Sequence, residues 1–158
     1  MSVNFSNTTP AAPSGSTNVT FQTDGSGNVS AYITSAVELT GNGFDGTLQS
    51  ADISLTDLIT SPTDGLYRVT AYIIVTTVDG ASSTLPKITM SWNDQDNGQA
   101  QTFDITPTNS GNLLTTFEQS DAFLSISSSG PLQFQTSGYA SGTPATMQFA
   151  IHIRVEQL

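Results

Sequence analysis

Two segments of the chain alternate apolar and polar side chains with a period of two, over lengths at which a helix would scatter the apolar residues around its axis. In residues 66–78 one face of a strand would contain Tyr67, Val69, Ala71, Ile73 and Val75. In residues 147–155 the same spacing groups Met147, Phe149, Ile151, Ile153 and Val155. Each segment therefore predicts a β-strand with one face in a hydrophobic core.

Composition extends this prediction to the rest of the chain. Lys and Glu, which favour helices, are scarce, whereas Ser and Thr are abundant, and Thr suits the pleated surface of a sheet. Further short apolar runs, separated by turn signals such as Asn97-Gly98 and Gly130-Pro131, lie near 51–58, 88–92, 103–105, 117, 122–126 and 132–134. We therefore predict an all-β fold, an antiparallel jelly-roll-like β-sandwich of about eight strands.

The first 45 residues have a different character. Residues 1–17 are rich in Ser, Thr, Pro, Ala and Gly, and only Val3 and Phe5 stand out as large apolar side chains able to contact a partner. Two alternating runs, 18–22 and 29–33, flank the turn TDGSGN and predict a hairpin. Three glycines within 41–46 predict a boundary. We expect an anchoring arm and hairpin over 1–45 and the sandwich domain over 46–158.

The charge balance excludes several classes of partner. The chain has thirteen acidic residues and only three basic ones, Arg68, Lys87 and Arg154, which gives a net charge of -10. Such a surface repels phosphate, so we expect no nucleic-acid binding and no attraction to anionic lipid. No apolar run approaches the roughly 20 residues that span a bilayer, so we expect no membrane insertion. The first residues lack the pattern of a secretion signal, so we expect synthesis in the cytoplasm without a signal peptide.

The supply of catalytic side chains is small. The chain contains no Cys and a single His, His152, on the polar face of the last predicted strand. Neither a G-x-S-x-G elbow nor a glycine-rich phosphate loop before a helix is present. A Ser-His-Asp triad stays open, because its members meet only in space. We predict a non-enzymatic protein without a cofactor.

Asp94 and Asp96, in the segment WNDQDNG, are weak candidates for a calcium site. Oxygen ligands at alternating positions can converge on Ca²⁺, but the later bidentate acid of such loops is missing. Asp, Asn and Gly are also the residues of hairpin turns. The turn is the favoured interpretation, and we predict no metal site apart from this weak candidate.

Three aromatic residues are candidates for binding surfaces. Trp92 is in phase with Ile88 and Met90, which favours core packing. Tyr139 begins the loop 138–144 and is a possible ligand contact. Tyr72 and Ile74 fall on the otherwise polar face of the strand over 66–78, and a strand that is apolar on both faces is usually covered on both. We predict that Tyr72 and Ile74 form an interface, in a homotrimer.

Two stretches resemble known protein families. The segment NVTFQTDGSGNVSAYI is similar to parts of phage and prophage virion proteins of the fibre or decoration type. The segments GLYRVTAYIIVTT and MQFAIHIRVEQL resemble core strands of the trimeric jelly rolls of C1q and tumour necrosis factor. The resemblance extends over nearly the whole chain but consists of strand patterns, and the collagen-like stalk of C1q is missing.

The resemblance implies a structural protein of the virion. It would decorate or cement a capsid, or associate with a fibre, through contacts with its own copies and with a major capsid or tail protein. The alternative is a receptor- or glycan-binding tip module of a tail fibre, with Tyr139 and the 94–98 turn as ligand contacts.

Overall fold

A computed structural model describes residues 19–23, 29–33, 37–142 and 146–158, and side-chain surroundings from residue 43 onward. The described residues form twelve strands. They are β1 (Val19–Thr23), β2 (Val29–Ile33), β3 (Val37–Gln49), β4 (Thr56–Ile59), β5 (Gly65–Thr77), β6 (Thr84–Leu85), β7 (Lys87–Asn93), β8 (Ala100–Thr106), β9 (Asn109–Ser110), β10 (Phe117–Ile126), β11 (Leu132–Ser137) and β12 (Gln148–Gln157). No helix able to cross a membrane occurs in this part of the chain.

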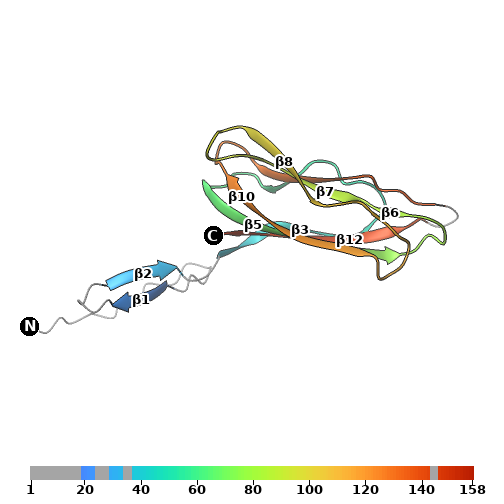
Figure 1. Cartoon of the computed structure of the whole chain (residues 1–158), viewed down its shortest axis with the longest axis horizontal. Helices are drawn as coiled ribbons and strands as arrows, with labels where there is room; N and C mark the ends of the chain where they lie inside the picture. Colours follow the sequence, from blue (N-terminus) through green and yellow to red (C-terminus); the bar gives the residue numbers. More distant parts are fainter. Residues whose placement is uncertain (1–18, 24–28, 34–36, 143–145) are drawn as a thin grey trace, which may run out of the picture.

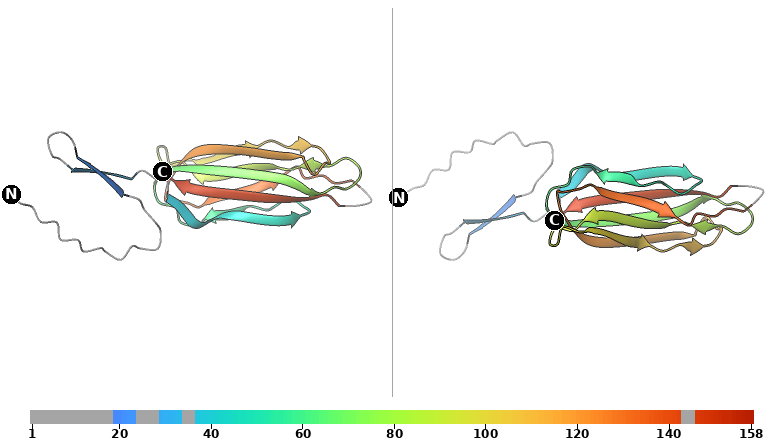
Figure 2. Two further views of the ribbon diagram at one scale, coloured as in Figure 1. Left: turned by 90° about the horizontal axis from the view of Figure 1, so that it is seen from below. Right: turned by 90° about the horizontal axis from the view of Figure 1, so that it is seen from above.

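Two four-stranded sheets pack face to face (Figures 1 and 2). The β5 sheet has the order β10-β5-β12-β3, and the β7 sheet has the order β4-β11-β7-β8. The antiparallel pairs are nested along the chain, since β3 pairs with β12, β4 with β11, β5 with β10 and β7 with β8. This nesting is that of a long antiparallel ribbon rolled into two sheets, the jelly roll. The predicted fold class is confirmed.

The core lies between the two sheets. The two predicted apolar stripes form the inner faces of the central strands β5 and β12, and their side chains are buried. The β7 sheet contributes the buried side chains Ile88, Met90, Leu132 and Phe134. Phe44 of β3 contacts Phe134 across the core, with ring centroids 4.7 Å apart. The predicted alternation is thus confirmed, and it leaves the opposite face of each central strand outside the core.

The predicted domain boundary at 45/46 falls within β3. β3 runs through this segment and pairs with β12 on both sides of it, from Val37 opposite Gln157 to Gln49 opposite Phe149. Two glycines are needed there for close packing rather than for a linker. A Cβ on Gly43 would lie 2.5 Å from the carbonyl oxygen of Ile153, and one on Gly46 would lie 2.6 Å from the ring of Phe44.

Other expectations for the first half of the chain have mixed outcomes. The predicted hairpin is confirmed, since β1 and β2 pair antiparallel from Val19 opposite Ile33 to Thr23 opposite Val29. The strand expected over 51–58 is shorter and later, at Thr56–Ile59. Val3 and Phe5, the predicted anchoring residues of the arm, lie outside the described residues.

A buried carboxylate joins three loops at one end of the sandwich. Asp79, in the β5–β6 loop, is almost fully buried and accepts hydrogen bonds from the backbone N–H of Ala81 (2.8 Å) and of Gly142, and from the hydroxyl of Ser141 (3.1 Å). Its own N–H donates to Asn112 Oδ1 (3.0 Å). The Ala81 N–H, with the bonds from Gly142 and Ser141, holds the Asp79 pKa below the ordinary 3.8.

Candidate functional site: the outer face of the β5 sheet

The side of the β5 sheet that faces away from the core gathers aromatic and ionised side chains from all four strands. Cross-strand register sets the neighbours, because Tyr72 lies opposite Gln119 on one side and His152 on the other, and His152 lies opposite Asp45. We call this surface the outer face. Its residues are Asp45, Leu66, Arg68, Thr70, Tyr72, Ile74, Phe117, Gln119, Asp121, Phe123, Ala150, His152, Arg154 and Glu156.

Three rings form a row across β10, β5 and β12. The ring centroids of Phe117 and Tyr72 are 5.9 Å apart at an interplanar angle of 36°, and those of Tyr72 and His152 are 6.3 Å apart at 23°. Phe117 at the end of the row is 50% exposed. Because Tyr72 and His152 stand on the two central strands, their backbones are fixed by pairing on both sides. The row is therefore a pre-formed aromatic strip on a rigid support.

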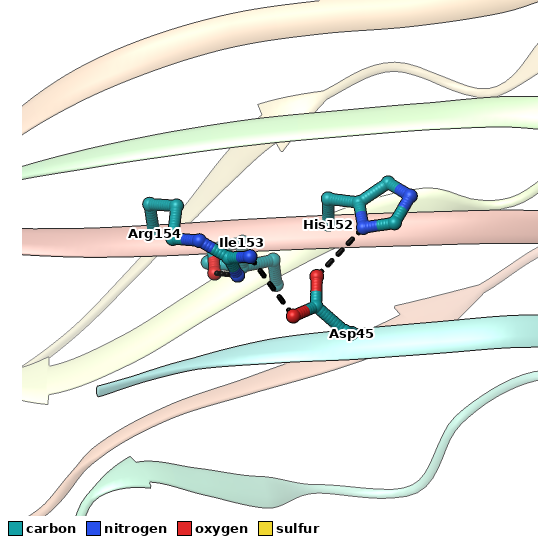
Figure 3. A network of polar contacts seen from close by, with 4 residues as sticks. All are labelled: Asp45, His152, Ile153 and Arg154. Carbon is teal, nitrogen blue, oxygen red and sulfur yellow. Dashed lines mark hydrogen bonds and ion pairs between the residues drawn. The ribbon is translucent and has the colours of Figure 1, made fainter. Parts of the chain in front are cut away.

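Asp45 continues this row onto β3 and binds two side chains of β12 (Figure 3). One carboxylate oxygen, Oδ1, lies 2.6 Å from His152 Nδ1, and the other, Oδ2, accepts a bond of 2.9 Å from Arg154 Nη2. Arg154 Nη1 also donates to the carbonyl of Ile153 (3.0 Å). The hydrogen bonds from Arg154 and then from His152 lower the pKa of Asp45 below 3.8. Asp45 therefore stays ionised and orients both partners.

A second ion pair lies one row further along the sheet. Arg68 Nε donates to Glu156 Oε2 (2.8 Å), and the Arg68 guanidinium makes a further contact with the same oxygen. Two of the three cationic residues of the chain, Arg68 and Arg154, are thus on the outer face. The third, Lys87, binds Asp104 of the other sheet at 2.7 Å. The outer face therefore combines aromatic, cationic and anionic groups.

Tyr139, predicted as a ligand contact, packs inward. Its hydroxyl donates to the carbonyl of Met147 (2.6 Å), and its ring lies against Phe149 with centroids 5.8 Å apart. The backbone N–H of Tyr139 donates to Asp52 Oδ1 (3.1 Å). The hydroxyl is therefore already used within the fold, and we do not place Tyr139 in the candidate site.

The carboxylates of the 94–98 turn serve the hairpin between β7 and β8. Asp94 Oδ1 accepts the backbone N–H groups of Asp96 (3.0 Å) and Asn97 (3.2 Å). Asp96 Oδ2 accepts the hydroxyl of Ser125 (3.2 Å). Among the described residues, no group of three or more His, Cys, Asp or Glu side chains is arranged to hold a metal ion.

The structure places Tyr72 and Ile74 on the outer face, half-exposed, as their phase in the sequence predicted. Sequence reasoning missed two contributors. Asp45 was assigned to the segment before the domain, and Phe117 was treated only as a strand marker. A signal for Phe117 exists in its isolation among polar neighbours, TTFEQS, whereas Asp45 could be found only from the pairing of β3 with β12.

No protein-family model matches the chain, and no curated protein sequence matches it. Among solved structures, the chain is similar to the CBM22-1 xylan-binding domain from Paenibacillus barcinonensis Xyn10C, with 12% identity over 91% of this chain and 84% of that one, at a TM-score of 0.38. The CBM22-2 domain of the same protein gives 7% identity, 92% and 88% coverage and a TM-score of 0.37.

A third similar structure contains the CBM22-1 and GH10 modules of a Clostridium thermocellum endo-1,4-beta-D-xylanase complexed with xylohexaose. The identity is 14%, over 78% of this chain and 24% of that one, at a TM-score of 0.39.

Proposed function

We propose that this protein is a non-enzymatic binding module that recognises a neutral glycan through the outer face. The observation that supports the proposal is the row Phe117, Tyr72 and His152, which continues into the carboxylate of Asp45. Aromatic rings offer flat apolar surface to the C–H faces of sugar rings. The neighbouring carboxylate, guanidinium, amide and phenol groups offer both acceptors and donors to sugar hydroxyls.

The charges of the outer face favour a hydroxyl-rich ligand over a second protein subunit. A subunit that covered this face would have to desolvate Asp45, Arg68, Asp121, Arg154 and Glu156. The attraction within a buried ion pair offsets the free-energy cost of desolvation only when its geometry is excellent. The cores of protein interfaces are accordingly depleted in charged residues. A glycan leaves such groups partly hydrated and replaces water with hydroxyls, at a smaller electrostatic penalty.

The glycan is expected to be uncharged. Three of the five ionised groups are acidic, and the chain as a whole has a net charge of -10, which repels polyanions. Because the ring row crosses three strands on an open sheet face, it suits an extended chain of sugar units rather than a single monosaccharide.

The proposal is tested by a glycan-array screen of the wild-type protein, followed by titration of the best ligand against two variants. We expect Tyr72→Ala and Phe117→Ala each to weaken binding by about 10-fold or more, since truncating a central ring removes a hot spot. The matched control is Phe103→Ala, which removes an equally exposed ring of the β7 sheet. The proposal would be overturned if no neutral glycan on the array bound the protein, or if the bound glycan had the same affinity for the Tyr72→Ala variant as for the wild type.

We propose as a second candidate the structural virion role that the resemblance implies, in which the outer face contacts other subunits of a homotrimer or a capsid or tail protein. Apolar Ile74 and Leu66 on this face, and the hairpin β1–β2, whose strands form a sheet of their own, support it. Its test is deletion of residues 1–17, which should abolish particle association and leave the sandwich folded. Association that survives the deletion would count against it.

A further inference from the structure

Phe123 is a fourth aromatic ring on the outer face, separate from the ring row. It lies in β10, and the register places it opposite Arg68 of β5. Its side chain is 59% exposed, more than Phe117 at the end of the ring row. Leu66, diagonal to Phe123 in the same pair of strands, is 47% exposed, and diagonal neighbours on one sheet face lie within reach of an aromatic side chain. We call Phe123 and Leu66 the Phe123 patch.

The ring of Phe123 is exposed because the long side chain opposite it is bound elsewhere. Arg68 lies between Phe123 and Glu156 across the sheet, since β5 is flanked by β10 and β12. Its Nε donates to Glu156 Oε2 (2.8 Å), so the guanidinium is held toward β12 and away from β10. A guanidinium over the face of the ring would have covered it. The ion pair therefore leaves this aromatic surface open to a ligand.

Two polar side chains of β10, Gln119 and Asp121, lie between the ring row and the Phe123 patch. Gln119 is opposite Tyr72, and Phe123 follows it by four residues on the same face, which is a separation of about 13 Å along a strand. Both polar residues are exposed, and neither side chain makes a hydrogen bond or ion pair with another described residue. The other ionised side chains of the outer face are each paired. Gln119 and Asp121 therefore have their bonding groups available to a ligand.

The unpaired carboxylate favours a ligand rich in hydroxyl groups on this stretch of β10. A protein surface packed there would have to supply a partner for Asp121 or bury its charge unpaired, which costs free energy. Sugar hydroxyls, and the water that a glycan leaves in place, both donate to a carboxylate. The net charge of -10 disfavours a sugar chain that is itself anionic.

We propose that a glycan bound at the ring row extends along β10 to a second subsite, where a further sugar ring packs on the Phe123 patch. Between the two subsites the Asp121 carboxylate accepts hydrogen bonds from sugar hydroxyls, and the Gln119 amide donates or accepts them. The inference rests on the proposed glycan binding and adds the class of glycan to it. This class is a linear, neutral oligosaccharide long enough to cover about 13 Å beyond Tyr72.

The length of the ligand provides the first test. Oligosaccharides of increasing length, prepared from the neutral glycan that binds on the array, are titrated against the full-length protein by calorimetry. We expect the affinity to rise with length until the chain reaches the Phe123 patch. The longest oligomers should bind about 5-fold or more tighter than the shortest oligomer that binds, since a second aromatic contact is added. Affinity that does not rise beyond the shortest oligomer would overturn the second subsite.

Variants then locate the gain in affinity. Phe123→Ala should weaken the longest oligomers by about 5-fold or more and leave the shortest one unchanged, which also shows that the variant is folded. Asp121→Ala should give the same pattern with a loss of about 3-fold. Tyr72→Ala should weaken both lengths. The matched control is Phe103→Ala, which removes a 48% exposed ring of the β7 sheet and should weaken neither.

Failure of the second subsite can be told apart from failure of the ring row. Binding that is lost in Tyr72→Ala but equal in Phe123→Ala and the wild type at every length would overturn the second subsite alone. A loss in Phe123→Ala that is the same for short and long oligomers would also overturn it, because the Phe123 patch would not be a separate subsite. If no oligomer binds the wild type, the ring row and the second subsite are both overturned.

Discussion

His152 and Asp45 face each other across the β12–β3 pair, with Nδ1 of the imidazole 2.6 Å from Oδ1 of the carboxylate, while Tyr72 stacks on the same imidazole from β5. The ring therefore has a fixed orientation between two neighbouring strands. Asp45 also holds Arg154, so one carboxylate positions both the last ring of the row and the guanidinium beside it.

Replacing Asp45 with Ala tests this positioning role. We expect glycan affinity to fall by about 3-fold to 10-fold, because His152 and Arg154 lose their shared acceptor and become free to rotate. The measurement is titration calorimetry with the ligand found on the array. Asp57→Ala is the matched control, since Asp57 of β4 accepts a comparable bond from Gln133 (2.7 Å) on the other sheet. Unchanged affinity in Asp45→Ala would show that the network is not part of the binding surface.

The hydrogen-bonded carboxylate of Asp79 predicts that the folded protein loses stability in acid. Its pKa in the folded protein lies below the ordinary 3.8, chiefly because of the Ala81 N–H. The carboxylate therefore stabilises the fold above pH 3.8, and this contribution is lost as the pH falls through 3.8 toward the lower folded value. We expect Asp79→Asn to unfold at lower urea concentration at pH 7 and to lose less stability between pH 7 and pH 3. An identical pH dependence in the variant and the wild type would contradict this role.

The burial of Phe134 between the two sheets predicts that the stability of the fold depends strongly on this side chain. Its side chain is fully buried and touches Phe44 of the opposite sheet, so Phe134→Ala should lower the free energy of unfolding by about 3 to 5 kcal/mol. The exposed Phe117 provides the control, since Phe117→Ala should change the free energy of unfolding by about 0.5 kcal/mol or less. Urea unfolding measures both. Similar losses for the two variants would mean that the core is placed wrongly.

The β7–β8 turn requires a residue that accepts positive φ. Gly98 has φ 68°, and its N–H donates to the Asp94 carbonyl at 2.9 Å. A Cβ there would meet nothing within 4 Å, so the penalty is purely conformational. Gly98→Ala should cost about 1 kcal/mol, and Gly98→Asn less, because Asn tolerates this region. Thermal unfolding of both variants decides the matter, and an Ala variant as stable as the Asn variant would contradict the assigned turn.

The fold was largely predictable from the sequence, because alternation with a period of two is a local property. The stripes in β5 and β12 identified the inner face of the central strands, and the same phase placed Tyr72 and Ile74 outside the core. The glycines of 41–46 could not be interpreted from the sequence alone, since a glycine that permits close packing looks like one that permits a linker.

The candidate site was only partly predictable, because its parts are distant in the chain. His152 contacts Asp45, and the two residues are 107 positions apart. For Tyr139 the sequence suggested an exposed side chain, because the residue lies in a loop. In the structure its hydroxyl instead donates a hydrogen bond to the carbonyl of Met147. Both contacts depend on which strands are neighbours. The alternation of apolar and polar residues does not reveal strand order, because many strand orders have the same alternation.

The most direct test of the account is an NMR titration of the ¹⁵N-labelled protein with the neutral glycan identified on the array. The account predicts that the largest shifts occur in the outer face, at Tyr72, Gln119, His152 and Asp45, and that Trp92 of β7, in the other sheet, shifts little. Shifts concentrated elsewhere, with the outer face unchanged, would contradict the assignment of this face as the binding surface.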